Sequence, residues 1–454
     1  MAVTQLHRKT PTPAHPVGTV AAGVTTPWFM AHSGPIAAIA LGVALSLTPG
    51  VLPRAWPMQA VVTALFVVAA LVLLAGVRRF RCGFAPLAGA AAAGISVFAA
   101  LGALWFNWSW QNLLRTEMGM PTIGVTHWTL TAVTTAALTG LVVVTARNVP
   151  RVFVPLRRGV VATIASVAVV YTFVLPLGNT VVTRSVQPAG LAIPASVAGN
   201  PSLAGSTASL VRWDELGSHG QRFVSNATTS VRVYAGPLSA ATVDDRARLV
   251  GAELERAGGL RKEHLVLAFP TGSGWLDANA LDAMEARFGA DLAIAAMAYS
   301  QRPSWMSYLF GRSEAEAAAV AFAREISHQI RNIPADDRPN IYLYGLSMGA
   351  VAGASALAAL TGFAPEIETC GALWAGPPPG VDRTTVRTAL VENPTDPVTL
   401  WQPNLLFQPA PELHVWLPVI SYLQVSADLA NSLAASPGFG HRYGSEQGSM
   451  LPGC

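Results

Sequence analysis

The sequence predicts a bundle of about five transmembrane α-helices followed by an α/β domain, in which a mostly parallel sheet carries helices on both faces. Two observations support this fold class. Of the 454 residues, 52% are hydrophobic and only 12% are charged, which is too apolar for a soluble protein of this length. Acidic side chains are also rare at the start, because Glu117 stands alone in residues 1–180, whereas later residues carry an ordinary mixture of charges. The chain therefore divides into a membrane part and a water-exposed part.

Five apolar stretches in the first part are long enough to cross about 30 Å of hydrocarbon as helices. They cover residues 34–51, 57–77, 85–105, 127–146 and 159–177. The first stretch is short and bounded by glycine and proline, and a cleavable signal peptide is its alternative because Arg8 and Lys9 precede it. Further spans follow, so we expect a cytoplasmic tail (1–33), a helical bundle (34–178) and a linker and entry segment (179–230).

Basic residues predict the orientation of the bundle, because lysine and arginine are retained on the cytoplasmic side. The N-terminus and alternate connections hold most of them: Arg8, Lys9, Arg78, Arg79, Arg81, Arg147, Arg151, Arg157 and Arg158. The opposite loops hold Arg54 and Arg115. With the N-terminus inside, an odd number of spans places the second part outside the cytoplasmic membrane. No acidic or basic residue lies deep within a span, so the bundle is interpreted as an anchor and a transporter role is disfavoured.

The three cysteines agree with this orientation. Cys82 falls on the predicted inner side, whereas Cys370 and Cys454 fall outside, where a disulfide can persist; whether they pair is left open. Their spacing fits no zinc motif, and we expect no metal and no organic cofactor. The net charge of +4 suggests nucleic-acid binding, but no stripe of basic residues follows, and we exclude that partner.

The second part, residues 231–454, alternates strand-type and helix-type runs. The strand-type runs are 231–235, 264–269, 292–299, 341–344, 372–374, 386–391 and 414–417, and the helix-type runs are 243–257, 278–288, 313–330 and the small residues after Met348. Such alternation predicts a mostly parallel sheet covered by helices on both faces.

The pentapeptide Gly345-Leu346-Ser347-Met348-Gly349 lies between a strand-type run and a small-residue helix. A nucleophile at a strained strand-to-helix turn needs small neighbours, and Gly345, Gly349 and Gly353 supply the space. Ser347 is therefore the predicted nucleophile. The competing interpretation is a glycine-rich nucleotide-binding turn, which is disfavoured because neither a Gly-x-Gly-x-x-Gly pattern nor a phosphate-loop lysine is present.

A serine hydroxyl at neutral pH needs a base and a group that orients the base. In the α/β-hydrolase arrangement the chain order is serine, acid, histidine. Asp396 follows the sixth strand-type run among turn residues and is the predicted acid, with Asp382 and Glu392 as alternatives. His441 lies in a glycine-rich loop and is the predicted base, with His414 as the alternative.

Two backbone amides must stabilise the oxyanion. The amide of Met348 follows the nucleophile, and the loop 270–275 after an early strand is expected to provide the second donor from Ser273 or Gly274, with an ordinary strand-to-helix glycine turn as the alternative. An aromatic-rich segment, 303–310, is interpreted as an acyl-pocket wall, a bilayer contact or simple core packing.

Five segments carry a family resemblance: 271–275, 299–305, 343–349, 396–397 and 440–443. Through them the chain resembles a family of actinobacterial membrane proteins with an N-terminal helical bundle and a C-terminal α/β-hydrolase domain. The resemblance implies a serine hydrolase of the cell envelope with Ser347, Asp396 and His441 as its triad. Ser273 stands where many relatives carry threonine.

Together these features predict a membrane-anchored, extracytoplasmic serine hydrolase, esterase-like or lipase-like, that forms an acyl-serine intermediate. Its expected partners are the lipid bilayer and a lipid or acyl-ester substrate of the cell envelope. One alternative is an acyltransferase that uses the same triad to acylate an envelope hydroxyl group. Another is a catalytically inactive, hydrolase-like binding module.

Overall fold

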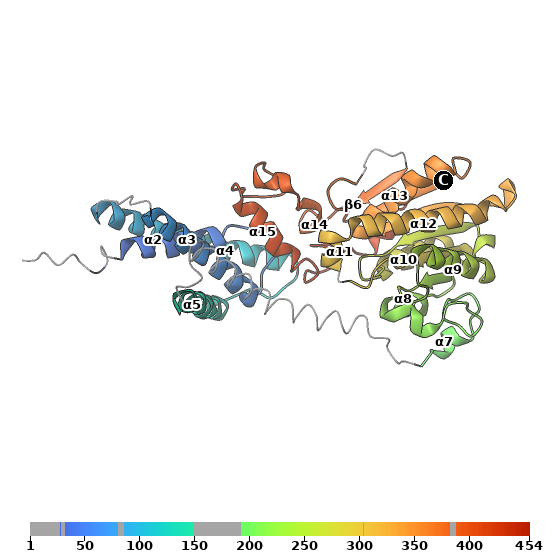
Figure 1. Ribbon diagram of the computed structural model, residues 1–454, viewed down its shortest axis with the longest axis horizontal. Helices are drawn as coiled ribbons and strands as arrows, with labels where there is room; N and C mark the ends of the chain where they lie inside the picture. Colours follow the sequence, from blue (N-terminus) through green and yellow to red (C-terminus); the bar gives the residue numbers. More distant parts are fainter. Residues whose placement is uncertain (1–27, 29–31, 80–85, 149–191, 303, 382–386) are drawn as a thin grey trace, which may run out of the picture.

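The computed structural model describes residues 28, 32–79, 86–148, 192–302, 304–381 and 387–454. The bundle helices are α2 (Ser33–Ser46), α3 (Trp56–Arg79), α4 (Pro86–Glu117) and α5 (Val125–Asn148). They occupy one end of the molecule, and the α/β domain occupies the other (Figure 1). The expected fifth span, 159–177, lies outside the described residues.

Within the described residues, three helices are long and apolar enough to cross a membrane: Trp56–Arg78, Ala88–Glu117 and Val125–Asn148. The first expected span differs, because α2 has 14 residues and is about 21 Å long at 1.5 Å per residue, less than the hydrocarbon thickness. It ends at Ser46 rather than at residue 51. Pro49 and Gly50 explain this end, because neither continues a helix readily.

Helix α4 extends beyond the expected membrane boundary at Trp105. Its 32 residues correspond to about 48 Å, which is longer than a bilayer core. The last turns carry three buried polar side chains, Asn107, Gln111 and Arg115, and each of them hydrogen-bonds to the loop between α2 and α3. The last turns of α4 therefore form buried polar contacts and extend beyond the apolar part of the bundle.

The α/β domain contains a six-stranded sheet in which every pairing is parallel. Its strands are β1 (Val231–Ala235), β2 (His264–Phe269), β3 (Leu292–Met297), β4 (Asn340–Leu346), β5 (Thr369–Ala375) and β6 (Thr388–Val391). The spatial order is β1-β3-β2-β4-β5-β6. The first five strands are almost fully buried because helices cover both faces, whereas the edge strand β6 is only partly buried.

Helices cover the two faces of the sheet in two separate cores. One core contains α9 (Val243–Arg256), α12 (Arg312–Arg331) and α13 (Met348–Phe363), and the other contains α8 (Gly217–Ser225) and α10 (Ala278–Phe288). Successive residues of a strand point to opposite faces of the sheet. In β2, Leu265 and Leu267 face the first core, whereas Val266 and Ala268 face the second. This arrangement confirms the predicted parallel sheet with helices on both faces.

The described part of the expected linker packs on the sheet. It contains α7 (Ala195–Ala198), the 3₁₀ turn η2 (Trp213–Leu216) and α8. Val197, Leu216 and Phe223 are buried in the same core as α10. These residues therefore extend the second helical layer.

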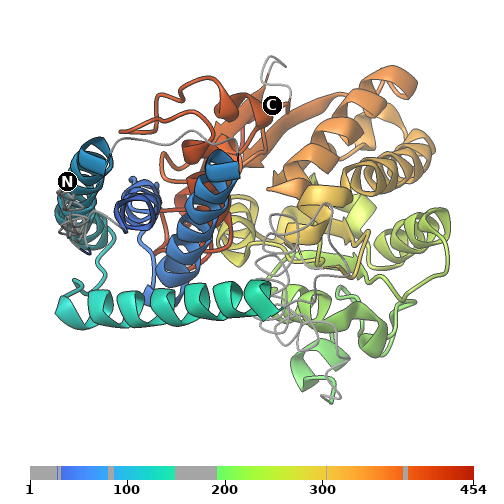
Figure 2. The same cartoon turned by 60° about the vertical axis from the view of Figure 1, so that its left-hand side comes forward.

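The prediction of a seventh strand at residues 414–417 is wrong. Proline at positions 411 and 418 restricts the backbone on both sides, and the Trp416 indole donates to the carbonyl oxygen of Leu405 at 3.0 Å. The run belongs to a long segment between β6 and the C-terminus, which contains α14 (Pro397–Leu400), η6 (Pro403–Leu406) and α15 (Ile420–Leu429). Figures 1 and 2 both show this red segment beside the blue bundle helices.

Cys370 and Cys454 form a disulfide, so the pairing that the sequence left open is present. The bond joins β5 to the C-terminal residue across a separation of 84 residues. A Cβ atom at Gly371 would lie 2.9 Å from Pro452, so the C-terminal tail lies directly on β5. The last residues of the chain are therefore covalently attached to the sheet.

Candidate active site

The strand order reverses its direction between β2 and β4. The chain leaves β2 toward α10 on one face of the sheet and leaves β4 toward α13 on the opposite face. In parallel α/β sheets, ligands bind at such a reversal of strand order. The loop that follows β2, residues 270–276, and the turn that contains Ser347 therefore meet at the expected binding position.

Ser347 occupies a strained turn between β4 and α13. Its φ of +57° and ψ of −124° are unfavourable for a residue with a side chain. Its amide donates to the carbonyl oxygen of Ala375 at 2.9 Å, which fixes the turn to β5. A Cβ atom at Gly349 would overlap the carbonyl oxygen of Phe269, so the turn approaches β2 closely enough to require glycine. These contacts hold Ser347 at the top of the sheet.

Asp396 and His441 are in direct contact. The Nδ1 atom of His441 lies 2.7 Å from Oδ2 of Asp396. Asp396 is completely buried, and its Oδ1 accepts a hydrogen bond from the amide of Val398 at 2.8 Å as the cap of α14. The two residues are 45 positions apart in sequence, and the segment between them folds back so that the imidazole reaches the carboxylate.

The alternatives to this pair lie elsewhere or cannot be placed. The ring of His414 contacts Trp110 in a tilted arrangement with ring centroids 4.5 Å apart, at the bundle end of the domain. Glu392 is exposed just after β6. Asp382 lies outside the described residues.

The His441 ring lies beside the Ser347 turn. Ala375 accepts the Ser347 amide, and a Cβ atom at the next residue, Gly376, would lie 2.7 Å from Cε1 of His441. The φ of Gly376 is +51°, which favours glycine for a second reason. Within the described residues, Nε2 of His441 is buried and makes no hydrogen bond, so this nitrogen is available to accept a proton. Hydrogen bonds between a nucleophile and its base are often long before substrate binds.

Tyr443 is a member of this cluster that the sequence analysis missed. Its hydroxyl donates to Oδ2 of Asp396 at 2.6 Å, and its ring is 2% exposed. Burial, and secondarily the negative charge of Asp396, raise the pKa of Tyr443, so the hydroxyl stays protonated and donates at every pH of interest. In the sequence, Tyr443 follows His441 by two positions, and that spacing alone does not show that its hydroxyl reaches Asp396.

The loop 270–276 has a backbone turn that decides which of its amides is available. The Gly274 amide donates to the carbonyl oxygen of Thr271 at 2.8 Å, and the Thr271 amide donates to Trp275 at 2.9 Å. Gly274 therefore does not fit the expected role of second oxyanion donor, because its N–H closes the turn. The Ser273 amide has no hydrogen-bond partner within the described residues and remains available.

The aromatic segment forms α11 (Ser304–Phe310), which packs behind this loop. The Ser304 hydroxyl lies 3.3 Å from Oγ1 of Thr271, whereas Leu309 and Phe310 are exposed. A small apolar cavity lies nearby, lined by Phe269, Pro270, Met297, Tyr299 and alanines of α12 and α13. Its volume of about 10 Å³ holds a single water at most, so it is not an acyl-chain pocket in this conformation.

A parallel sheet with a strained serine at a strand-to-helix turn and a buried His–Asp pair beside it defines the α/β-hydrolase class. Models of the family described as "Alpha/beta-hydrolase family" match residues 231–385 and 379–451, and the model of its N-terminus matches residues 47–227. Since these matches cover most of the chain, the chain belongs to this α/β-hydrolase family. No curated protein and no solved structure matches it.

Proposed function

We propose that the protein is a membrane-anchored, extracytoplasmic serine hydrolase that cleaves acyl esters of a lipid or of an acylated envelope component. The observation that carries the proposal is the 2.7 Å contact between His441 and buried Asp396, with the second imidazole nitrogen available beside the strained Ser347 turn. A serine, a base and an orienting acid in this arrangement are what nucleophilic acyl chemistry requires.

In the proposed reaction, Nε2 of His441 accepts the Ser347 proton as Oγ attacks the acyl carbonyl carbon. The amides of Met348 and Ser273 stabilise the oxyanion of the tetrahedral intermediate. His441 then gives the proton to the leaving alkoxide, and the acyl-Ser347 ester remains. Water, deprotonated by His441, attacks this ester, releases the carboxylic acid and restores the serine. Asp396 holds Nδ1–H and stabilises the imidazolium in both steps.

A lipid is the substrate class that best fits the surroundings of the site. Two exposed apolar side chains of α11, Leu309 and Phe310, lie on the helix that backs the loop 270–276. The segment between Asp396 and His441 exposes Phe407 and Leu423 as well. The same segment contacts the membrane bundle, which fits a substrate drawn from the bilayer.

Three observations support a location outside the cytoplasm. The Cys370–Cys454 disulfide fits an oxidising compartment. The two arginines of the predicted outer loops, Arg54 and Arg115, lie at the end of the bundle that contacts the α/β domain, which supports a position of that domain on their side of the membrane. The distribution of basic residues places that side outside.

The proposal is tested by labelling the detergent-solubilised full-length protein with a fluorophosphonate probe and by measuring hydrolysis of p-nitrophenyl esters of increasing acyl length. We expect labelling and hydrolysis in the wild type and neither in Ser347→Ala. The exposed Ser449→Ala change is the matched control and should behave like the wild type. Equal labelling of the wild type and Ser347→Ala would contradict the proposal.

Product analysis separates hydrolysis from acyl transfer, because both use the same residues. In water the proposed hydrolase releases free acid at the rate at which the ester is consumed. Addition of a small alcohol should leave free acid as the main product. An ester of the added alcohol as the main product would instead identify an acyltransferase.

A further inference from the structure

The segment between the proposed acid and base does not rest on the sheet alone. Residues 397–440, here called the acid–base segment, share a hydrophobic cluster with the bundle. The bundle contributes Val51, Leu52, Leu114 and Met118, and the acid–base segment contributes Leu400, Leu405, Val425 and Ala435. This cluster is separate from both sheet cores. Four of the eight buried residues of this cluster thus come from the membrane part of the chain.

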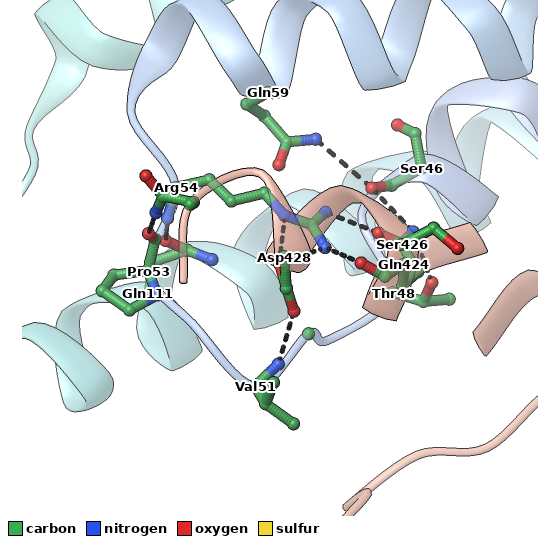
Figure 3. A network of polar contacts seen from close by, with 12 residues as sticks. Ser46, Thr48, Val51, Pro53, Arg54, Gln59, Gln111, Gln424, Ser426 and Asp428 are labelled. Atoms are coloured by element: carbon green, nitrogen blue, oxygen red, sulfur yellow. Dashed lines mark hydrogen bonds and ion pairs between the residues drawn. The ribbon is translucent and has the colours of Figure 1, made fainter. Parts of the chain in front are cut away.

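A buried ion pair lies at the centre of this contact (Figure 3). The Arg54 guanidinium, two residues before α3, lies 2.7 Å from Asp428 of α15, and the two side chains are 2% and 0% exposed. The other Asp428 oxygen accepts the amide of Val51 at 2.8 Å. Arg54 also donates to the carbonyl oxygen of Gln424 at 3.0 Å, and its own backbone amide donates to Gln111 of α4 at 2.8 Å.

Further polar contacts fix the same two surfaces to each other. The Gln424 amide nitrogen donates to the carbonyl oxygens of Leu45 and Ser46, at 3.0 and 3.1 Å. Asn431 donates to the carbonyl oxygen of Pro53 at 2.7 Å, and the Ser436 hydroxyl donates to that of Met118 at 2.6 Å. A simple anchor needs none of these buried and geometrically specific bonds.

The docked segment leads directly to the proposed base. The amide of His441 donates to the carbonyl oxygen of Ser432, four residues after Asp428, at 2.9 Å. At Gly440, whose φ is +56°, a Cβ atom would lie 3.2 Å from a methyl group of Leu52 in the bundle and 2.7 Å from Ser432. The backbone on which the imidazole is mounted is therefore packed against bundle residues.

We propose that the bundle is a positioning element of the active site, in which the Arg54–Asp428 contact holds the acid–base segment so that His441 faces Ser347. This inference rests on the proposed hydrolase function. Arg54 and Asp428 are positioning residues, because they act through the segment that carries His441. A small displacement of a catalytic group is sufficient to slow a reaction strongly.

The test compares Arg54→Met, Asp428→Leu and the double variant in the full-length protein, with p-nitrophenyl ester as substrate. A single change leaves one buried charge without its partner, whereas the double change replaces the pair with apolar side chains. We expect each single variant to lose about 10-fold to 100-fold in kcat with KM within about two-fold of wild type. The double variant should recover most of the loss. Arg331→Met, which breaks the exposed Arg331–Glu366 pair, is the matched control and should leave kcat unchanged.

Hydrogen exchange of the backbone amides in residues 428–441 reports docking independently of catalysis. We expect faster exchange there in the single variants and near-normal exchange in the double variant. Wild-type kcat in the single variants would overturn the positioning role, whether or not exchange changes. Loss of kcat without faster exchange in this segment would overturn it too. If the wild type itself is neither labelled at Ser347 nor active, the hydrolase function fails, and exchange still shows whether the ion pair holds the segment.

Leu52→Ala keeps the test decisive if the charge variants do not fold. Leu52 contacts Gly440, next to His441, and the change leaves the ion pair intact. We expect a fall in kcat with KM little changed, together with faster exchange near Gly440. A folded Leu52→Ala protein with wild-type kcat would contradict the proposal.

Discussion

Asp396 is the most constrained side chain of the proposed triad. Both of its oxygens are occupied, Oδ1 by the Val398 amide and Oδ2 by His441 and the Tyr443 hydroxyl. A fully buried carboxylate needs such donors because no water solvates it. The fixed carboxylate selects the tautomer of His441 that carries its proton on Nδ1, and Nε2 is then free to act as the base.

Tyr443→Phe tests this arrangement, since it removes one donor to a buried charge while the ring remains. Hydrogen bonds to charged groups contribute about 1.5–3 kcal/mol, so we expect kcat for ester hydrolysis to fall about 10-fold or more. Asp396→Asn should cost far more, about 10⁴-fold, because it favours the wrong tautomer. Tyr422→Phe, at a partly buried tyrosine of α15, is the control. An unchanged kcat in Tyr443→Phe would show that the third hydrogen bond is dispensable.

At the residue scale, the sequence predicted Ser347, Asp396 and His441 from local context and chain order, and those roles stay predictions until activity is measured. It could not predict Tyr443, because its role depends on a backbone return that no local pattern encodes. It also could not distinguish Ser273 from Gly274. The turn hydrogen bond from Gly274 to Thr271 makes that distinction.

The sequence predicted a helix or strand correctly where the elements that pack against it are close in sequence, or where its side chains are completely buried. The six strands of the sheet are short apolar runs between helices, and such runs are typical of buried parallel strands. The run 414–417 has the same composition but no neighbouring strand, and its apolar side chains belong to a segment that packs with the bundle. Composition alone does not separate these two environments.

The buried ion pair between Arg232 of β1 and Glu285 of α10 predicts how the stability of the protein depends on pH. Burial tends to raise the pKa of Glu285, but amide hydrogen bonds from Thr229 and Ser230 and the Arg232 guanidinium lower it to about 2. A carboxyl group with a depressed folded-state pKa contributes stability above its unfolded value, near 4.5, and loses it as the pH falls toward 2.

Glu285→Gln should therefore destabilise the protein most at neutral pH. The change leaves Arg232, which is 0% exposed, without its buried partner, and we expect a loss of about 3–5 kcal/mol in unfolding free energy at pH 7. The difference from wild type should shrink as the pH falls below about 4. Urea unfolding of the wild type and the variant at a series of pH values measures this difference in unfolding free energy. Glu366→Gln, at an exposed ion pair, is the control. A difference that is constant with pH would contradict the assignment.

For the whole molecule, the sequence separated the membrane part from the catalytic part, but it did not predict how they meet. Arg54 was counted as a charge of an outer loop, and its pairing with Asp428 involves residues 374 positions apart. No periodicity or motif reports a contact at that separation. The bundle was accordingly interpreted as an anchor, whereas in the structure residues of the bundle and of the segment that leads to His441 share one hydrophobic cluster.

The disulfide gives a prediction for the whole chain. Protein isolated from membranes with thiols blocked should show Cys370 and Cys454 as one linked peptide pair by mass spectrometry and Cys82 as a free thiol. The double change Cys370→Ser/Cys454→Ser should lower the unfolding free energy by about 2–4 kcal/mol, because the bond closes a long loop. Free thiols at both positions in the isolated protein would contradict an oxidising location.

Trapping the acyl-enzyme tests nucleophilic catalysis by Ser347 most directly. The full-length protein is mixed with an activated acyl ester, quenched in acid within the first turnovers, digested and analysed by mass spectrometry. We expect the acyl mass on Ser347, in the peptide that contains Gly345 and Gly349, and its absence in Ser347→Ala. An acyl group on another residue, or the same adduct in Ser347→Ala, would contradict nucleophilic catalysis by this serine.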